Sequence, residues 1–199
     1  MMNIIVTAFN NSKVSDDAYH AGKNILKSLP DIIDEVKIKK VILPLVFNRC
    51  FDELEPHIDS NTKAIISFGS AGGDRFAIER VCLNRMHSNG PDNDGYQATD
   101  EIIKQDGQPA YFTNLNIRRI ETSLNQHNIP SIISNSAGLA LCNNIFYHTA
   151  YYADKHHLDY RFGFIHVPHM EHMTNANKHT MKLSELITGA SIIINDILQ

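Results

Sequence analysis

Apolar and polar positions alternate along the chain in a pattern that predicts short strands separated by helices. Compact apolar runs predict buried strands at 3–8, 36–43, 64–68, 131–134 and 161–167. Helically spaced apolar residues predict helices from Ser15 or Asp16 to about Pro30, at 51–58 and 114–126, from the turn at 135–138 to about Lys155, and at 182–198. Strands that alternate with helices are typical of an α/β protein with a largely parallel sheet and helices on both faces.

Two further stretches complete the pattern. Residues 76–83 have an extended pattern, and residues 84–100 form a polar, loop-like segment. A glycine-rich turn, Gly69 to Gly73, directly follows the predicted strand at 64–68. No linker, repeat or low-complexity stretch interrupts the chain, so we expect one domain over residues 1–199.

The composition argues against two classes of binding partner, duplex nucleic acid and membranes. The chain has 199 residues, 43% of them hydrophobic, with 18 Lys and Arg against 22 Asp and Glu and a net charge of −4. This mildly acidic balance argues against duplex nucleic acid, because phosphate binding needs clustered basic residues. No apolar run approaches the roughly 20 residues that cross a bilayer, so we expect no membrane partner.

The cysteines and the amino terminus bear on localisation. Cys50, Cys82 and Cys142 are odd in number and far apart, which fits neither a disulfide framework nor a CxxC metal knuckle. The first residues, Met1 to Val6, lack the basic region and the cleavage site of a secretory signal. We therefore expect a cytoplasmic protein with reduced cysteines.

Three residues could carry nucleophilic chemistry. Cys142 follows a strand and a tight turn at the start of a predicted helix, where unpaired N–H groups stabilise a thiolate and an oxyanion. His166 lies at the carboxyl end of an apolar strand, where it could serve as a base. Glu79 lies between apolar residues and could orient that base, since a buried carboxylate needs a partner.

Each of the three residues also has an ordinary structural interpretation. Cys142 could face the core from its helix, and His166 could donate to a buried carbonyl. Glu79 could form an internal ion pair with Arg80 or Arg75. Taken singly, none of the three predicts a catalytic site.

A metal site and a phosphate site are competing interpretations. The chain has 11 histidines, including the pair His169 and His172, but it lacks an H-E-x-x-H sequence. We expect His169, His172, His156 and His157 to be surface residues and expect no metal or other cofactor. The Gly69–Gly73 turn lacks the Lys-Ser/Thr of a P-loop, so we expect it to shape a site loop.

Read together, several segments resemble the pyroglutamyl peptidase I family of cysteine peptidases over nearly the whole chain and in the same order. The matching segments are Val6–Phe9, Gly69–Gly73, Glu79–Val81, Pro91–Gly95, Pro109–Phe112, Ser134–Gly138, Cys142–Asn143 and Gly163–Pro168. The last of these, G-F-I-H-V-P, resembles the sequence around the family's catalytic histidine. Several motifs in register are far more specific than any one alone.

The resemblance implies a fold and a reaction. The fold is a single-domain α/β/α sandwich with a mixed, largely parallel sheet. Cys142 is implied as the nucleophile, His166 as general base and later acid, and Glu79 as the residue that orients His166. The substrate is a peptide or small amide with an N-terminal pyroglutamate, hydrolysed through a thioester without a metal, by a homotetramer or a homodimer.

The chain departs from the family around the expected substrate pocket. After Phe9 the family has an aromatic loop, whereas this chain has Asn10-Asn11-Ser12. Asn89-Gly90 replaces an Arg-Ile pair, and Leu45 replaces a Thr or Val. Leu139-Ala140-Leu141 replaces the family's Thr, aromatic and Val before the nucleophile. We take Phe9 and Leu141 as candidate pocket walls.

These changes leave two functions open. One is the peptidase reaction itself, or the same chemistry on a related cyclic or small acyl group. The other is a homologue that binds a peptide end or small amide without turnover.

Overall fold

The predicted strands assemble into one central sheet. The computed structural model describes residues 1–10, 20–171 and 180–199. In it, seven strands pair in the order β2-β3-β1-β4-β9-β5-β8. Their bounds are β1 Asn3–Asn10, β2 Ile32–Ile33, β3 Val36–Pro44, β4 Thr62–Ser70, β5 Phe76–Glu79, β8 Ser131–Ser134 and β9 Arg161–Val167. All pairs are parallel except β2 with β3 and β5 with β9, which makes the sheet mixed but largely parallel.

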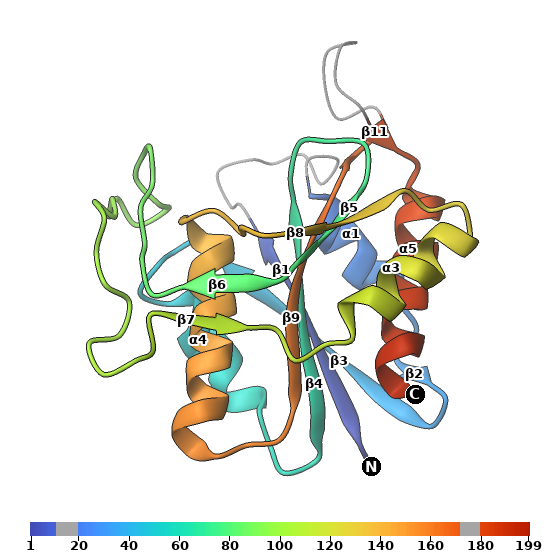
Figure 1. Cartoon of the computed structure of the whole chain (residues 1–199), viewed down its shortest axis with the longest axis horizontal. Helices are drawn as coiled ribbons and strands as arrows, with labels where there is room; N and C mark the ends of the chain where they lie inside the picture. The colour runs from blue at the N-terminus through green and yellow to red at the C-terminus, as the bar shows by residue number, and fades with distance from the viewer. Residues whose placement is uncertain (11–19, 172–179) are drawn as a thin grey trace.

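Helices cover both faces of this sheet, which confirms the α/β/α sandwich (Figure 1). The helices are α1 Ala21–Ser28, α2 Cys50–Leu54, α3 Ile117–Gln126, α4 Leu141–His156 and α5 Leu183–Leu198. Apolar side chains of α1, α3 and α5 bury one face of the sheet. Those of α2 and α4 bury the other face. Strands β1, β3, β4 and β9 therefore contribute side chains to both cores, whereas the apolar side chains of β5 belong to the first core alone.

The stretch at 76–83 is extended as predicted, but it is divided into two strands that belong to different sheets. β5 ends at Glu79, and β6 (Val81–Leu83) pairs with β7 (Ala110–Phe112) away from the central sheet. The break occurs at Arg80, whose N–H donates to Ser134 and whose carbonyl accepts from Thr113. A short pair, β10 (His169–Met170) and β11 (Thr180–Met181), was also not predicted.

Other predicted boundaries shift for local reasons. The strand predicted at 64–68 continues through Gly69 and Ser70, because both residues pair with β9. The helix predicted at 114–126 begins at Ile117, capped by the side chain of Asn116. The helix at 51–58 is α2 followed by a 3-10 turn, Glu55–His57. The cap predicted at Ser15 or Asp16 lies outside the described residues.

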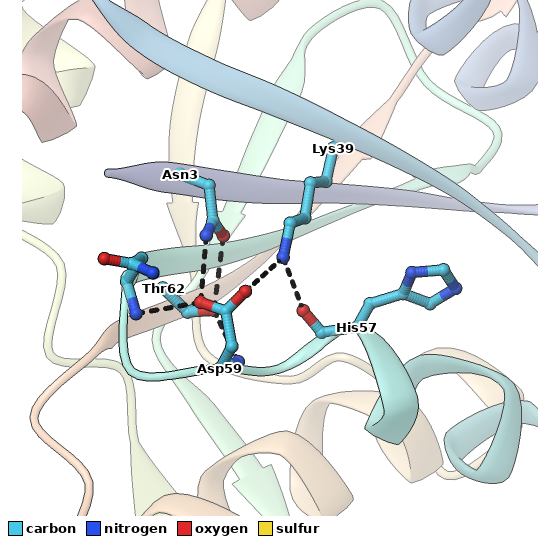
Figure 2. Close-up of polar contacts among 6 residues, drawn as sticks. Asn3, Lys39, His57, Asp59 and Thr62 are labelled. Carbon is cyan, nitrogen blue, oxygen red and sulfur yellow. Dashed lines mark hydrogen bonds and ion pairs between the residues drawn. The ribbon is translucent and has the colours of Figure 1, made fainter. Parts of the chain in front are cut away.

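A cluster of hydrogen-bonded polar side chains joins β1, β3 and β4 near their amino ends (Figure 2). The carboxylate of Asp59 accepts from Lys39 of β3 at 2.7 Å and from Asn3 of β1 at 3.1 Å. The hydroxyl of Thr62, the first residue of β4, accepts from the N–H of Asp59 and donates to the Asn3 side chain. The Lys39 hydrogen bond, more than any other contact, lowers the pKa of Asp59 to about 2. This cluster lies at the opposite end of the strands from the carboxyl ends of β4 and β9.

Among the described residues, no helix combines the length and the apolar character needed to span a membrane.

Candidate active site

The start of α4 holds Cys142 at the carboxyl edge of the sheet. β8 leads into a turn in which Gly138 has a φ of 76°, and α4 begins at Leu141, so Cys142 is its second residue. Cys142 is half-buried. Its sulfur lies against the end of β4, since a Cβ added to Gly69 would be 3.3 Å from Sγ. The first N–H groups of a helix have no intrahelical acceptor, so they face the region where this thiol can react.

His166 lies beside this thiol near the end of β9. Its neighbours across the sheet are Gly69 of β4 and Ala77 of β5. The imidazole Nδ1 is 2.7 Å from Oε1 of Glu79, and the ring is also hydrogen-bonded to the Cys142 side chain. Because Nδ1 faces Glu79, Nε2 is the nitrogen available to the thiol. The three predicted residues therefore form one continuous hydrogen-bonded row.

The electrostatics of this row favour the imidazolium form of His166. Burial by itself lowers the pKa of His166, because it penalises the charged ring. Hydrogen bonds with Cys142 and Glu79, together with the negative charges of those two groups, outweigh burial and raise the pKa to about 9. An imidazolium beside a thiol is the arrangement that stabilises a thiolate.

Glu79 is held in the interior and is paired with the histidine. Its side chain is 2% exposed, and its second oxygen, Oε2, has no hydrogen-bond partner among the described residues. The ion pairs considered as alternatives do not form: Arg80 donates to Asn135, and Arg75 donates to Asp74. The His166 ring is therefore the hydrogen-bond partner of this buried carboxylate.

A cavity of about 240 Å³, here called the Cys142 cavity, opens beside the thiol. Its walls are Phe9, His20, Gly22, Leu45, Phe68, Gly69, Ser70, Cys142 and His169. Phe9 and the altered position Leu45 thus line it, as the sequence predicts for a pocket wall. Leu141 is not among these lining residues and packs partly buried against the core beneath α4. Its predicted contact with substrate stays a prediction.

The other altered positions lie in different places. Ala140 is the exposed residue just before α4. Asn89 is exposed and Gly90 half-buried, both in the loop before Pro91, and Ser12 lies outside the described residues. His20 and Ser70 line the cavity although sequence reasoning missed them. Nothing in the sequence marks either residue as a wall residue. Ser70 falls within the glycine-rich segment, and His20 falls inside the predicted helix, whereas α1 begins only at Ala21.

The histidines offer no metal cluster in the part of the chain that the structure describes. No group of three or more His, Cys, Asp and Glu side chains comes together there. His156 and His157 are exposed, as expected. His169 is half-buried and lines the Cys142 cavity, which corrects the expectation of a surface residue; its place in β10 turns it toward the site. His172 lies outside the described residues.

The other two cysteines are sealed in the core. Cys50 and Cys82 are both fully buried, and burial raises the pKa of each thiol to about 12. Cys50 lies 3.3 Å from the Asn144 side-chain oxygen, and Cys82 lies 3.5 Å from the Tyr111 carbonyl. Of the three thiols, Cys142 is the accessible one.

Gly69 is predicted to be essential for the position of the sulfur. A Cβ at residue 69 would lie 2.7 Å from the Phe164 ring as well as 3.3 Å from Cys142 Sγ. We expect Gly69→Ala to destabilise the protein by about 1–3 kcal/mol through overpacking, and to lower activity per folded molecule. Thermal unfolding and active-site titration test this; a variant with unchanged stability and rate would contradict the close approach.

Comparison with known proteins places this geometry in context. The model of the pyroglutamyl peptidase family matches residues 2–199. The pyrrolidone-carboxylate peptidase of Thermosipho melanesiensis is 37% identical over 203 residues, which cover 99% of this chain and 98% of the relative. The Staphylococcus aureus protein of that name, from bovine strain RF122, is 37% identical over 201 residues, which cover 98% and 93%.

Solved structures match the fold equally closely. The pyrrolidone carboxyl peptidase of Pyrococcus furiosus superposes with a TM-score of 0.91 at 28% identity, covering 99% of this chain and 98% of that one. The pyroglutamyl peptidase I of Bacillus amyloliquefaciens has a TM-score of 0.91 at 27% identity, covering 100% and 96%.

Proposed function

Because the chain belongs to the pyroglutamyl peptidase family of cysteine-type exopeptidases, we propose that it removes pyroglutamate from the amino terminus of peptides, with Cys142, His166 and Glu79 as its catalytic residues. The observation that carries the proposal is the hydrogen-bonded row from Cys142 through His166 to Glu79, whose thiol lines the Cys142 cavity. We also propose that residues 1–199 act as one catalytic domain, since both cores share the central sheet.

Acylation begins with transfer of the thiol proton to His166. The Cys142 thiolate attacks the pyroglutamyl carbonyl carbon, a C–S bond forms, and the carbonyl oxygen becomes an oxyanion. N–H groups at the start of α4 stabilise this charge. The C–N bond then breaks, and the His166 imidazolium gives its proton to the leaving amine. The product of this half-reaction is a thioester on Cys142.

Deacylation reverses the roles. Neutral His166 takes a proton from water as the water oxygen attacks the thioester, and the C–S bond breaks to release pyroglutamate and the thiolate. Glu79 is the positioning residue of both steps. Its carboxylate fixes Nδ1 as the protonated nitrogen and stabilises the imidazolium, because the pair is buried and hydrogen-bonded at 2.7 Å.

The substrate proposal is tested by a panel of fluorogenic amides that carry pyroglutamyl, prolyl and alanyl groups. We expect selective cleavage of the pyroglutamyl amide, because the Cys142 cavity is small and partly apolar, with Phe9 and Leu45 in its walls. Prolyl amide has the ring without the lactam carbonyl, and alanyl amide lacks the ring. Cleavage of none of the three would contradict the proposed substrate.

A second candidate is the same acyl-transfer chemistry on a different small amide. It is favoured by the altered cavity wall at Leu45 and by the polar side chains of His20 and Ser70. The hydroxyl oxygen of Ser70 accepts from the N–H of Gly22 at 3.4 Å, so the hydroxyl proton is left to donate to another acceptor. Turnover of another cyclic acyl amide in preference to pyroglutamyl amide would favour this candidate.

A further inference from the structure

A second hollow lies beside the imidazole of His166 and shares no lining residue with the Cys142 cavity. It has a volume of about 350 Å³. Its walls come from the loop after β4, the start of β5, the turn before α4 and the end of β9. They include Ala71, Gly72, Arg75, Ser136, Gly138 and His166. We call this the His166 hollow.

The two reactive groups open into different spaces. Cys142 lines the Cys142 cavity and not the His166 hollow, whereas His166 and Glu79 line the hollow and not the cavity. The two spaces are neighbours, because Ser70 belongs to the cavity and the next residue, Ala71, belongs to the hollow. A bond held between the thiol and the imidazole therefore borders both spaces.

The chemistry assigns one half of the substrate to each space. During acylation the carbonyl carbon is bonded to sulfur, while the amine nitrogen takes its proton from the imidazole and must lie within hydrogen-bond reach of it. We infer that the His166 hollow is the subsite for the residue that leaves with the amine. This inference rests on the proposed peptidase function and adds the site of the leaving residue to it.

The walls of the hollow indicate which leaving residue it takes. The guanidinium of Arg75 already donates to both carboxylate oxygens of Asp74, at 2.7 and 3.1 Å. Glu79 is engaged by His166. Because Arg75 is paired with Asp74 and the His166 ring with Glu79, and because the other walls are mostly Gly, Ala and Ser, the hollow offers no uncompensated charge for a substrate to pair with. Its volume lies at the lower end of ligand pockets, which fits one uncharged residue.

Filling the hollow should select against large leaving groups. Gly72 has no atom within 4 Å of an added Cβ and no left-handed φ, so the backbone accepts a side chain there. For Gly72→Phe we expect kcat/KM for pyroglutamyl-phenylalanine to fall by about tenfold or more. Pyroglutamyl amide, which releases only ammonia, should keep its value within about twofold. Ser136→Phe, from the turn before α4, should give the same selectivity.

The readout is the ratio of the two kcat/KM values in each variant, which does not depend on the fraction of folded enzyme. Thr188→Phe, on the exposed side of α5, is the matched control and should leave this ratio unchanged. Equal losses for both substrates, or no loss for either, in both hollow variants would overturn the inference. Failure of the proposed function looks different, because the unsubstituted protein would then cleave neither substrate.

Discussion

Replacing Cys142 with alanine is expected to lower kcat/KM for a pyroglutamyl amide by about 10⁴-fold or more, the scale of loss seen when a covalent nucleophile is removed. In the proposed mechanism the sulfur is the atom to which the acyl group is transferred, and neither of the other thiols can replace it. Both are fully buried, with pKa values raised to about 12 by that burial.

The matched control is Cys82→Ala. It removes a thiol from the same chain, but Cys82 is in contact with the Tyr111 carbonyl in the core beside β7 and does not border the Cys142 cavity. We expect its activity per folded molecule to stay within about twofold of the unsubstituted protein. A folded Cys142→Ala variant with undiminished turnover would show that the sulfur is not the nucleophile.

Glu79→Gln is expected to lower kcat/KM by about 10²–10⁴-fold and to move the basic limb of the pH profile of kcat/KM to lower pH. The carboxylate is one of the groups that raise the pKa of His166 to about 9, so its neutralisation makes the imidazolium deprotonate earlier. The pH profile separates positioning from simple loss of structure, because misfolding lowers the rate without moving the limb. Asp59→Asn is the matched control, with its carboxylate at the opposite end of the sheet.

The same pair links stability to pH. The pKa of His166 in the folded protein lies above its usual value of 6.5, so folding favours its protonated form. This contribution is complete below pH 6.5 and is lost as the pH rises through about 9. In Glu79→Gln the alkaline part of the thermal-unfolding profile should therefore flatten. An unchanged basic limb together with an unchanged unfolding profile would contradict the role of Glu79.

The local sequence pattern predicted the order of strands and helices along the chain, because the central strands β1, β4 and β9 are buried on both faces and are largely apolar. It could not predict the break at Arg80, since that break depends on hydrogen bonds to Thr113 and Ser134, both more than 30 positions away. The antiparallel pairing of β5 with β9 is also non-local. Nothing in the sequence around residues 76–83 specifies which neighbour β5 will take.

The candidate site also has a part that the sequence predicted and a part that it did not. Motifs in register pointed to Cys142, His166 and Glu79, and the fold brings these three together. The residues that line the Cys142 cavity were less predictable, because a residue of almost any type can line a cavity if the fold turns it toward that cavity. His20 and Ser70 come from separate elements and meet there through packing of α1 on β4.

The central claim is that pyroglutamyl groups are transferred to Cys142, and the most direct test is to trap the acyl-enzyme. The protein would be mixed with a pyroglutamyl amide, quenched in acid within the first turnover and digested, and its peptides would be analysed by mass spectrometry. We expect the pyroglutamyl group on the peptide that contains Cys142, and not on those that contain Cys50 or Cys82. Turnover with no acylated peptide, or with the acyl group on another residue, would contradict the account.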